Sequence, residues 1–215
     1  MAYDVVIFDL DGTLLDTLDD LMDSCNYALS TIGAPPRTRA EIRRFVGNGI
    51  RNLMLQAVPD GADNPKFEQA YETMQTWYKA HNQIKTAPYP GVQRLFRTLK
   101  QQGVPMAVVS NKPDASVQML VEQWFPEITF GLGEREGLRR KPERDMVDYA
   151  IAQLGQTGKK TVYVGDSEVD LTTAANAGLD CISVTWGFRD RALLVERGAK
   201  QFADTAEELL RLIQG

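Results

Sequence analysis

Aspartates stand at the ends of two apolar runs in this chain. Asp9 and Asp11 follow the run 5–8, and Asp166 and Asp170 follow the run 161–165. Carboxylates hold divalent cations, attack electrophilic centres and transfer protons, so they can carry a reaction. A turn built from Asp, Gly and Thr after a strand is the ordinary alternative for the first pair, and the other polar residues must decide between the two.

Two further polar residues follow the same rule, and a third lies in a loop. Ser110 and Asn111 end the apolar run 106–109, and Lys141 stands directly before Pro142 in a loop. Four carboxylates at one place would repel each other unless a cation and hydrogen-bond donors offset their charge. Oxygen ligands without histidine or thiolate suit Mg²⁺, which also binds phosphate oxygens of a substrate. We therefore expect Mg²⁺ as the cofactor.

This set of residues fits phosphoryl transfer. An aspartate opposite a lysine can attack phosphorus and become an aspartyl phosphate, which splits one displacement into two easier ones. A second carboxylate two residues further on can protonate the leaving oxygen and later take a proton from water. Ser110 and Asn111 can donate hydrogen bonds to the phosphoryl oxygens, and Lys141 can balance their charge.

The elements that must position these residues are strands that alternate with helices. After the first run, strands are expected at 105–111, 127–132, 161–166 and 181–186, with helical patterns between them. Such alternation predicts an α/β fold, a Rossmann-like and mainly parallel sheet covered by helices on both faces. Ligands bind such sheets beyond the carboxyl ends of the strands, which is where the polar residues fall.

The segment 16–88 is different, because only helical patterns occur in it. Apolar residues recur at helical spacing over 18–32, Thr38 and Glu41 have the spacing of a capping box, and further helical stretches flank the GNG turn at 47–49. We expect an all-helical domain at 16–88, inserted into a catalytic core formed by 1–15 and 89–215.

Composition excludes several classes of protein. A formal net charge of −5 and a pI near 5.0 argue against a nucleic-acid partner, since no basic stripe is present. No apolar run approaches the length of about 20 residues that crosses a bilayer, and the first residues lack the pattern of a signal peptide, so we expect a cytoplasmic protein without a membrane partner. The single histidine, His81, rules out sites that need two imidazoles.

Four segments carry a resemblance to a known family. DLDGT at 9–13, VVSNK at 108–112, RKP at 140–142 and GDSEVD at 165–170 resemble, in order and spacing, the motifs of the haloacid dehalogenase superfamily. The chain looks most similar to the phosphoglycolate phosphatase-like branch, in which a small helical cap lies between the first two motifs. The resemblance implies a phosphoric monoester hydrolase.

The resemblance also implies roles for single residues. Asp9 would be the nucleophile and a metal ligand, Asp11 the acid/base and a ligand through its backbone carbonyl, and Asp166 the third ligand. Ser110 would bind the transferring group and Lys141 would neutralise it. The supporting positions are Gly12, Thr13, Asn111 and Asp170.

Asp11 discriminates within that superfamily. Its dehalogenases lack a carboxylate at this position and its transport ATPases carry threonine, so Asp11 favours phosphate-ester chemistry. In similar phosphatases a glycine-rich turn of the cap faces the site. By that analogy Asn48, Gly49 and Arg51 are candidates for contacting the substrate, although a plain helix-to-helix turn fits GNG equally well.

The expected activity is hydrolysis of a small phosphate monoester, with 2-phosphoglycolate as first choice by resemblance alone. Alternatives are a sugar-phosphate mutase similar to β-phosphoglucomutase, a pyrophosphatase or nucleotidase, and a catalytically silent protein that binds a metabolite. The expected partner is a small-molecule phosphate ester. The sequence leaves monomer and homodimer open.

Overall fold

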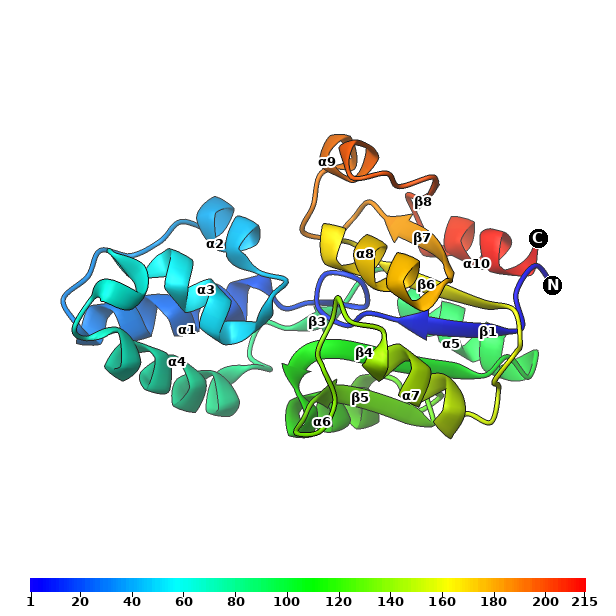
Figure 1. Cartoon of the computed structure of the whole chain (residues 1–215), viewed down its shortest axis with the longest axis horizontal. Coiled ribbons are helices and arrows are strands. Elements are labelled where there is room, and N and C mark those ends of the chain that lie inside the picture. The colour runs from blue at the N-terminus through cyan, green and yellow to red at the C-terminus, as the bar shows by residue number, and fades with distance from the viewer. The chain divides into compact units, whose positions relative to one another are not determined.

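A computed structural model describes all 215 residues, from Met1 to Gly215. The chain separates into two compact units (Figure 1): a core unit of Met1–Leu15 with Pro88–Gly215, and a helical unit of Asp16–Ala87. Two short paired strands, β2 (Leu15–Asp16) and β3 (Ala87–Pro88), form where the chain passes between the units. No helix combines the length and the apolarity needed to cross a membrane.

The core unit is built on one parallel sheet with the strand order β5-β4-β1-β6-β7-β8. The first strand lies in the middle, and later strands add first on one side of it and then on the other, so the order reverses at β1. In chain order the strands are β1 (Val5–Phe8), β4 (Met106–Pro113), β5 (Phe130–Glu134), β6 (Thr161–Gly165), β7 (Asp180–Val184) and β8 (Gln201–Ala203).

Side chains of each strand alternate between the two faces of the sheet, so both faces are apolar. Helices cover both of them. Val6 and Phe8 pack into the cluster that contains α5 (Val92–Gln101) and α10 (Ala206–Gln214). Val5 and Ile7 pack into the opposite cluster. The remaining helices of the core unit are α6 (Asp114–Trp124), α7 (Asp145–Gln153), α8 (Glu168–Ala177) and α9 (Arg191–Glu196). The expected α/β class is confirmed.

One strand begins later than expected. The strand predicted over 127–132 starts at Phe130, because the backbone N–H of Ile128 donates to the carbonyl of Phe125 at 2.9 Å and forms a turn there. Ile128 is nevertheless buried. Its apolar side chain belongs to a packed loop, which hydrophobicity alone does not distinguish from a strand.

The helical unit contains the helices that the sequence predicts. They are α1 (Leu18–Thr31), α2 (Arg39–Phe45), α3 (Gly49–Ala57) and α4 (Phe67–His81), with a 3₁₀ turn, η1 (Gly61–Asp63), between the last two. The capping box before α2 is confirmed: the N–H of Thr38 donates to Glu41 Oε2 at 2.8 Å, and the N–H of Glu41 donates to Thr38 Oγ1 at 3.3 Å.

A buried carboxylate fastens the end of this unit to its first helix. Asp20 on α1 is 2% exposed and accepts hydrogen bonds from the N–H groups of Lys85 and Thr86, each at 2.9 Å, and from Thr86 Oγ1 at 2.8 Å. Both oxygens are used, since the Lys85 N–H also approaches Oδ2 at 3.0 Å. Backbone donors therefore satisfy a charge that would be costly to bury alone.

Candidate active site

Sheet register brings three of the candidate residues to one edge. Phe8 on β1 is paired with Val108 on β4 and with Val164 on β6, so the residues that follow these positions continue side by side. The N–H of Asp9 donates to the carbonyl of Val164 at 2.9 Å. Asp9, Ser110 and Asp166 therefore meet at the carboxyl edge of the central strands, where the strand order reverses.

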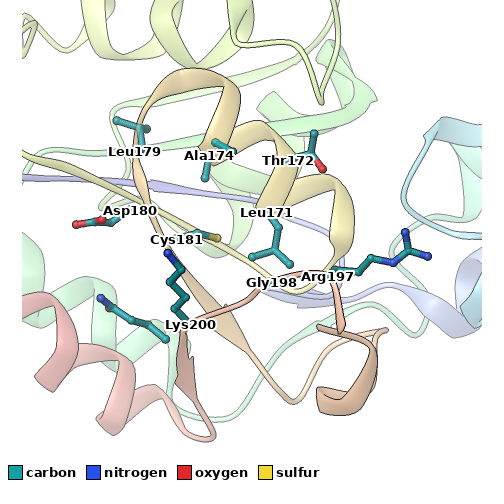
Figure 2. A pocket seen from close by; sticks show the side chains of 11 residues that line it. Leu171, Thr172, Ala174, Leu179, Asp180, Cys181, Arg197, Gly198 and Lys200 are labelled. Carbon is teal, nitrogen blue, oxygen red and sulfur yellow. The ribbon is translucent and has the colours of Figure 1, made fainter. Parts of the chain in front are cut away.

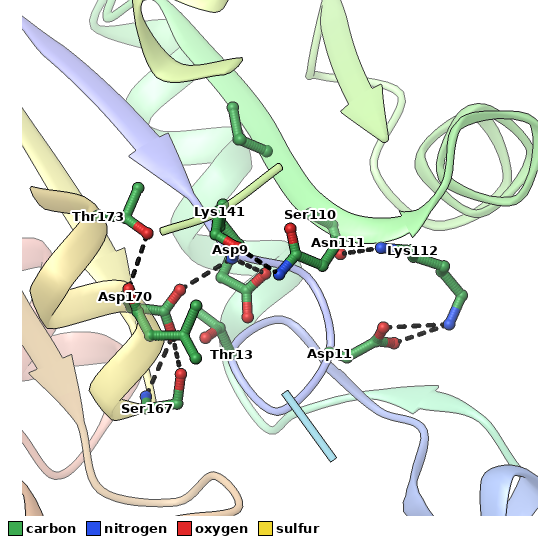
Figure 3. Close-up of polar contacts among 12 residues, drawn as sticks. Asp9, Asp11, Thr13, Ser110, Asn111, Lys112, Lys141, Ser167, Asp170 and Thr173 are labelled. Carbon is green, nitrogen blue, oxygen red and sulfur yellow. Dashed lines mark hydrogen bonds and ion pairs between the residues drawn. The ribbon is translucent and has the colours of Figure 1, made fainter. Parts of the chain in front are cut away.

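Lys141 is the centre of the polar network that Figure 3 draws. Its ammonium donates to Asp9 Oδ1 at 2.7 Å and to Asp170 Oδ1 at 2.9 Å. It also donates to the hydroxyl of Tyr163 at 3.0 Å. The lysine side chain is 3% exposed. An ammonium has three N–H donors, so these partners fix its position. Asp9 contacts the lysine through Oδ1, which leaves Oδ2 for another ligand.

Asp170 is held by its own helix start. Its Oδ2 accepts hydrogen bonds from the N–H groups of Asp166 at 3.2 Å and Ser167 at 3.1 Å, and from Ser167 Oγ at 2.7 Å. These contacts include a capping box at the start of α8. With both oxygens engaged, Asp170 serves to orient Lys141.

Asp166 sits in a narrow cradle of backbone. Its Oδ1 accepts a hydrogen bond from Thr13 Oγ1 at 3.2 Å, and its Oδ2 accepts one from the N–H of Phe188 at 2.7 Å. A Cβ on Gly12 would lie 2.5 Å from Asp166 Oδ2, and a Cβ on Gly187 would lie 2.3 Å from Asp166 Cβ. Gly12 also has a φ of +86°, so only glycine lets the first loop pass this carboxylate.

Burial and crowding govern the electrostatics of this cluster. Burial raises the pKa of Asp9 well above its usual value, Lys141 opposes that rise, and Asp170 and Asp166 add to it. Burial and the Asp170 charge raise the pKa of Asp166 to about 7. Burial alone would lower the pKa of Lys141, but Asp170 and Asp9 outweigh it and hold that pKa well above its usual value. Lys141 is bonded to Asp9 and Asp170 but not to Asp166, so the three carboxylates outnumber the ammonium groups that contact them.

These carboxylates fit a divalent cation. One oxygen each of Asp9, Asp166 and Asp170 lies within 4.8 Å of the others, and all three residues are buried. The donors are all oxygens, without histidine or cysteine, which is the set that hard cations bind. Because Asp170 is already saturated, Asp9 and Asp166 are the carboxylates with capacity for such an ion.

Asp11 is turned toward a different lysine. Lys112 Nζ donates to Asp11 Oδ1 at 3.0 Å and to Oδ2 at 3.1 Å (Figure 3). The lysine side chain is 3% exposed and the aspartate side chain is 17% exposed. The expected acid/base is therefore near the site and paired with Lys112, a residue to which the sequence patterns assign no role.

The end of β4 makes two contacts that belong to the site. The N–H of Lys112 donates to Ser110 Oγ at 3.3 Å, so the Ser110 hydroxyl can direct its own proton elsewhere. Asn111 Nδ2 donates to the carbonyl of Lys141 at 3.1 Å. Ser110 and Asn111 are both buried, and Asn111 links the second motif to the third.

The remaining candidates belong to the helical unit. Asn48 is the residue before α3, and Gly49 opens this helix with a φ of +74°. Arg51 donates to both carboxylate oxygens of Glu68, at 3.0 Å for Nη1, and its guanidinium lies 4.9 Å from the ring centre of Tyr71. The anion partner of Arg51 in this structure is thus a side chain of its own unit.

Tyr163 and the N–H of Phe188 are site groups that the sequence patterns do not single out. Tyr163 lies in a fully buried strand, and its hydroxyl reaches the carbonyl of Val109 at 3.4 Å as well as Lys141. A buried tyrosine needs a hydrogen-bond partner for its hydroxyl. The tyrosine within TVYVGD, one of the buried strands, could therefore have indicated a polar neighbour at this place.

A hollow lies at the opposite edge of the sheet from this site. It has a volume of about 380 Å³ and is bordered by Asp180, the first residue of β7 (Figure 2). Gln201, the first residue of β8, also lines it. Two cations, Arg197 and Lys200, line it. Its carboxylate, Asp180, accepts a hydrogen bond from the Tyr3 hydroxyl at 3.0 Å. It lacks the carboxylate cluster of the first site.

Comparison with known proteins adds to this geometry. The model of a family described as haloacid dehalogenase-like hydrolase matches residues 6–184. A phosphoglycolate phosphatase from Pseudomonas putida is 33% identical over 194 residues, which cover 86% of this chain and 70% of that protein.

Solved structures agree. A crystal structure from Lactobacillus delbrueckii subsp. bulgaricus has a TM-score of 0.94 and 39% identity, and covers 99% of both chains. A predicted phosphoglycolate phosphatase from Haemophilus somnus has a TM-score of 0.90 and 26% identity, and covers 99% of this chain and 98% of that one. The resemblance expected from the four motifs is confirmed.

Proposed function

The chain belongs to the haloacid dehalogenase-like hydrolase family and is a phosphatase, and on that premise we propose that it hydrolyses a small phosphate monoester with Mg²⁺ through phospho-Asp9. The first choice of substrate is 2-phosphoglycolate. The names of similar proteins support that choice, since curated relatives over most of the chain are phosphoglycolate phosphatases. Specificity itself depends on the side chains that meet the substrate and not on the fold.

One observation carries the proposal. Lys141 bridges Asp9 and Asp170, and Asp166 lies beside them with its carboxylate cradled by backbone. In this arrangement one oxygen of Asp9 is bonded to the Lys141 ammonium, and the other oxygen is available to attack phosphorus. It also supplies positive charge where the charge of a phosphoryl group would develop.

In the first step, Asp9 Oδ2 attacks the phosphorus of the ester. A bond forms between that oxygen and phosphorus while the bond from phosphorus to the ester oxygen breaks. Asp11 gives its proton to the departing oxygen, which leaves as an alcohol. Ser110 and Lys141 bind the transferring phosphoryl oxygens, as their positions beside Asp9 allow.

In the second step, water releases the product. Asp11, now a carboxylate, takes a proton from water, and the resulting nucleophile attacks the phosphorus of phospho-Asp9. The bond between phosphorus and Asp9 breaks, so inorganic phosphate leaves and the carboxylate is restored. A pair of aspartates two residues apart serves both steps.

The residues that would hold the cation are Asp9, Asp166 and the backbone carbonyl of Asp11. When bound, Mg²⁺ neutralises charge on the phosphoryl oxygens and orients the group. The four carboxylates Asp9, Asp11, Asp166 and Asp170 outnumber the two ammoniums of Lys112 and Lys141, and the guanidinium of Arg189 is paired with Glu168. A divalent ion would offset this excess of negative charge.

We also propose that the inserted helical segment, 16–88, serves as a cap that excludes water and selects the substrate. Asn48, Gly49 and Arg51 would contribute to that selection. For Arg51 to bind a substrate anion, the contact with Glu68 must be exchanged for one with the substrate. Exchange of one carboxylate for another keeps the guanidinium paired.

The test is release of free phosphate from a panel of phosphoglycolate, sugar phosphates, nucleotides, pyrophosphate and p-nitrophenyl phosphate, with Mg²⁺ or with a chelator. The Asp9→Asn variant is the blank. Mg²⁺-dependent release that the blank lacks supports the proposal, and the preferred compound identifies the substrate class. Isomerised sugar phosphate with little free phosphate would instead favour a mutase, and no release from any compound would contradict hydrolysis.

A further inference from the structure

The loop that follows β7 contacts the candidate active site from outside the four motifs. Its residues 186–189 have the sequence WGFR and lie between Val184, the last residue of β7, and α9. Trp186 Nε1 donates to the carbonyl oxygen of Thr13 at 3.0 Å. The N–H of Phe188 donates to Asp166 Oδ2 at 2.7 Å. These residues, 186–189, which we call the WGFR loop, therefore contact both the first motif and the fourth.

The WGFR loop is fixed by close packing and by an ion pair. A Cβ on Gly187 would lie 2.5 Å from the carbonyl oxygen of Gly12 and 2.3 Å from Asp166 Cβ, so only glycine fits between them. Arg189 is 8% exposed and donates through Nε and Nη2 to the two carboxylate oxygens of Glu168, at 2.7 and 3.1 Å. Such a two-point contact fixes direction as well as distance, so the loop has a defined place beside the site.

Thr13 connects Trp186 to a ligand of the proposed cation. The carbonyl oxygen of Thr13 accepts the indole N–H, and Thr13 Oγ1 donates to Asp166 Oδ1 at 3.2 Å. Thr13 is fully buried and lies in the turn that follows Asp9. One oxygen of Asp9 lies within 4.8 Å of one oxygen of Asp166, although the two residues follow different strands. The contact of Trp186 with Thr13 therefore acts on the separation of these two carboxylates.

We propose that the WGFR loop positions the ligands of the divalent cation, and that the indole N–H of Trp186 is its principal contact with the first motif. The inference rests on the proposed function, which makes Asp9 and Asp166 ligands of that cation. An indole N–H is a donor only, so Trp186 acts through Thr13 and is a positioning residue rather than a ligand. Removal of a group that orients metal ligands lowers metal affinity about 10- to 100-fold.

The test measures thermal unfolding of the full chain in a chelator and over a series of Mg²⁺ concentrations. A cation that binds only the folded protein raises the midpoint of unfolding by an amount set by its concentration relative to its Kd. Trp186→Phe keeps an aromatic ring and removes the N–H, and we expect the Kd of Mg²⁺ to rise about tenfold. The midpoint in chelator reports separately what the substitution does to packing.

Trp124→Phe is the matched control. Trp124 packs against the same apolar cluster as Trp186, and its buried Nε1 has no hydrogen-bond partner. The same atoms are removed there without loss of a hydrogen bond, so the Kd of Mg²⁺ should equal that of the wild type. If Trp186→Phe lowers the midpoint in chelator and leaves the Kd of Mg²⁺ unchanged, the indole only packs, which overturns the inference.

Arg189→Lys is a second variant, which decides the role of the loop if Trp186→Phe does not fold. It keeps the positive charge beside Glu168 and loses the two-point contact, so the Kd of Mg²⁺ should rise, by less than in Trp186→Phe. Arg191→Lys is its control, since the ion pair of Arg191 with Asp204 lies at the surface. With Trp186→Phe unfolded, an unchanged Kd in Arg189→Lys overturns the inference.

The same titration separates this inference from the proposed function. If the wild type releases no phosphate from any compound, the proposed hydrolysis fails, and the Kd values for Mg²⁺ still decide the role of the WGFR loop. If Mg²⁺ does not raise the midpoint of the wild type, the proposed cofactor and the inference are both overturned.

Discussion

Asp20 in the helical unit and Asp9 in the core unit are both buried carboxylates, 2% and 7% exposed, but they are satisfied in different ways. Asp20 accepts hydrogen bonds at both oxygens from backbone N–H groups and one hydroxyl. Asp9 contacts a lysine through one oxygen, shares this lysine with Asp170 and lies beside Asp166. The first carboxylate is complete without a ligand and the second is not.

This difference separates a structural carboxylate from a reactive one. Fixed amide donors stabilise a charge permanently, and they leave no lone pair for chemistry. Crowded carboxylates with too few hydrogen-bond donors raise the free energy of the unliganded site. Binding of a cation and a phosphoryl group lowers that free energy. Substitution should therefore cost stability at Asp20 and activity at Asp9.

The largest effect is expected for Asp9→Asn. Turnover should fall about 10⁴-fold or more, because the amide cannot form the aspartyl phosphate. The free energy of unfolding should stay the same or rise, since burial and neighbouring carboxylates raise the pKa of Asp9 well above its usual value and the substitution removes that unfavourable charge. Phosphate release and urea unfolding of the same sample measure both. A large loss of stability would remove the contrast with Asp20.

Asp20→Asn should lower the free energy of unfolding by about 2–4 kcal/mol, because an amide NH₂ would then face backbone donors. Urea unfolding of the full chain measures it. Asp19→Asn is the neighbouring control: Asp19 is 41% exposed and its ion pair with Arg39 lies at the surface, so the loss there should be under about 1 kcal/mol. Equal losses in the two variants would mean that the buried bonds of Asp20 add no stability.

Tyr163→Phe tests whether the tyrosine hydroxyl positions Lys141 in the active site. The variant keeps the buried ring and removes the hydroxyl that holds Lys141 at 3.0 Å, so kcat should fall about tenfold with a smaller change in KM. Steady-state kinetics on the best substrate measure both. Tyr3→Phe is the control, since the Tyr3 hydroxyl bonds Asp180 outside the site. Equal kcat for both variants and the wild type would show that this hydroxyl does not position the lysine.

The smallest effect concerns a third buried ionisable group, the thiol of Cys25, which burial keeps neutral. Burial raises its pKa to about 12, so the folded state keeps the proton after the unfolded thiol has lost it. The unfolded state then binds fewer protons, and stability falls as pH rises above the pKa of about 8.5 of a free thiol. Between about pH 8 and 9.5, the wild type should lose about 1 kcal/mol more than Cys25→Ala. Identical slopes of unfolding free energy against pH would contradict it.

Much of the architecture could be predicted from the sequence, because periodicity records which face of an element is buried. The change from helical patterns over 16–88 to alternating strands and helices predicted the sheet and the inserted helices. The last elements, β8 and α10, were not predicted, since β8 has only three residues and its edge position leaves a short apolar signal.

At the site, strand ends identified the aspartates and Lys141, but sequence could not assign their partners. The pairing of Asp11 with Lys112 depends on side-chain directions that no pattern encodes, and Tyr163 looks like one more apolar position in a buried strand. The expected anion contact of Arg51 is taken by Glu68, a residue 17 positions away on another helix. Such pairings arise only when the chain has folded.

The central claim is that Asp9 becomes phosphorylated, and it can be tested by stopping the reaction in acid within the first turnovers and mapping the peptides by mass spectrometry. We predict the mass of one phosphoryl group on the peptide that contains Asp9, dependent on Mg²⁺ and absent from Asp9→Asn. A fully active enzyme that never carries this group, or carries it on another residue, would contradict the account.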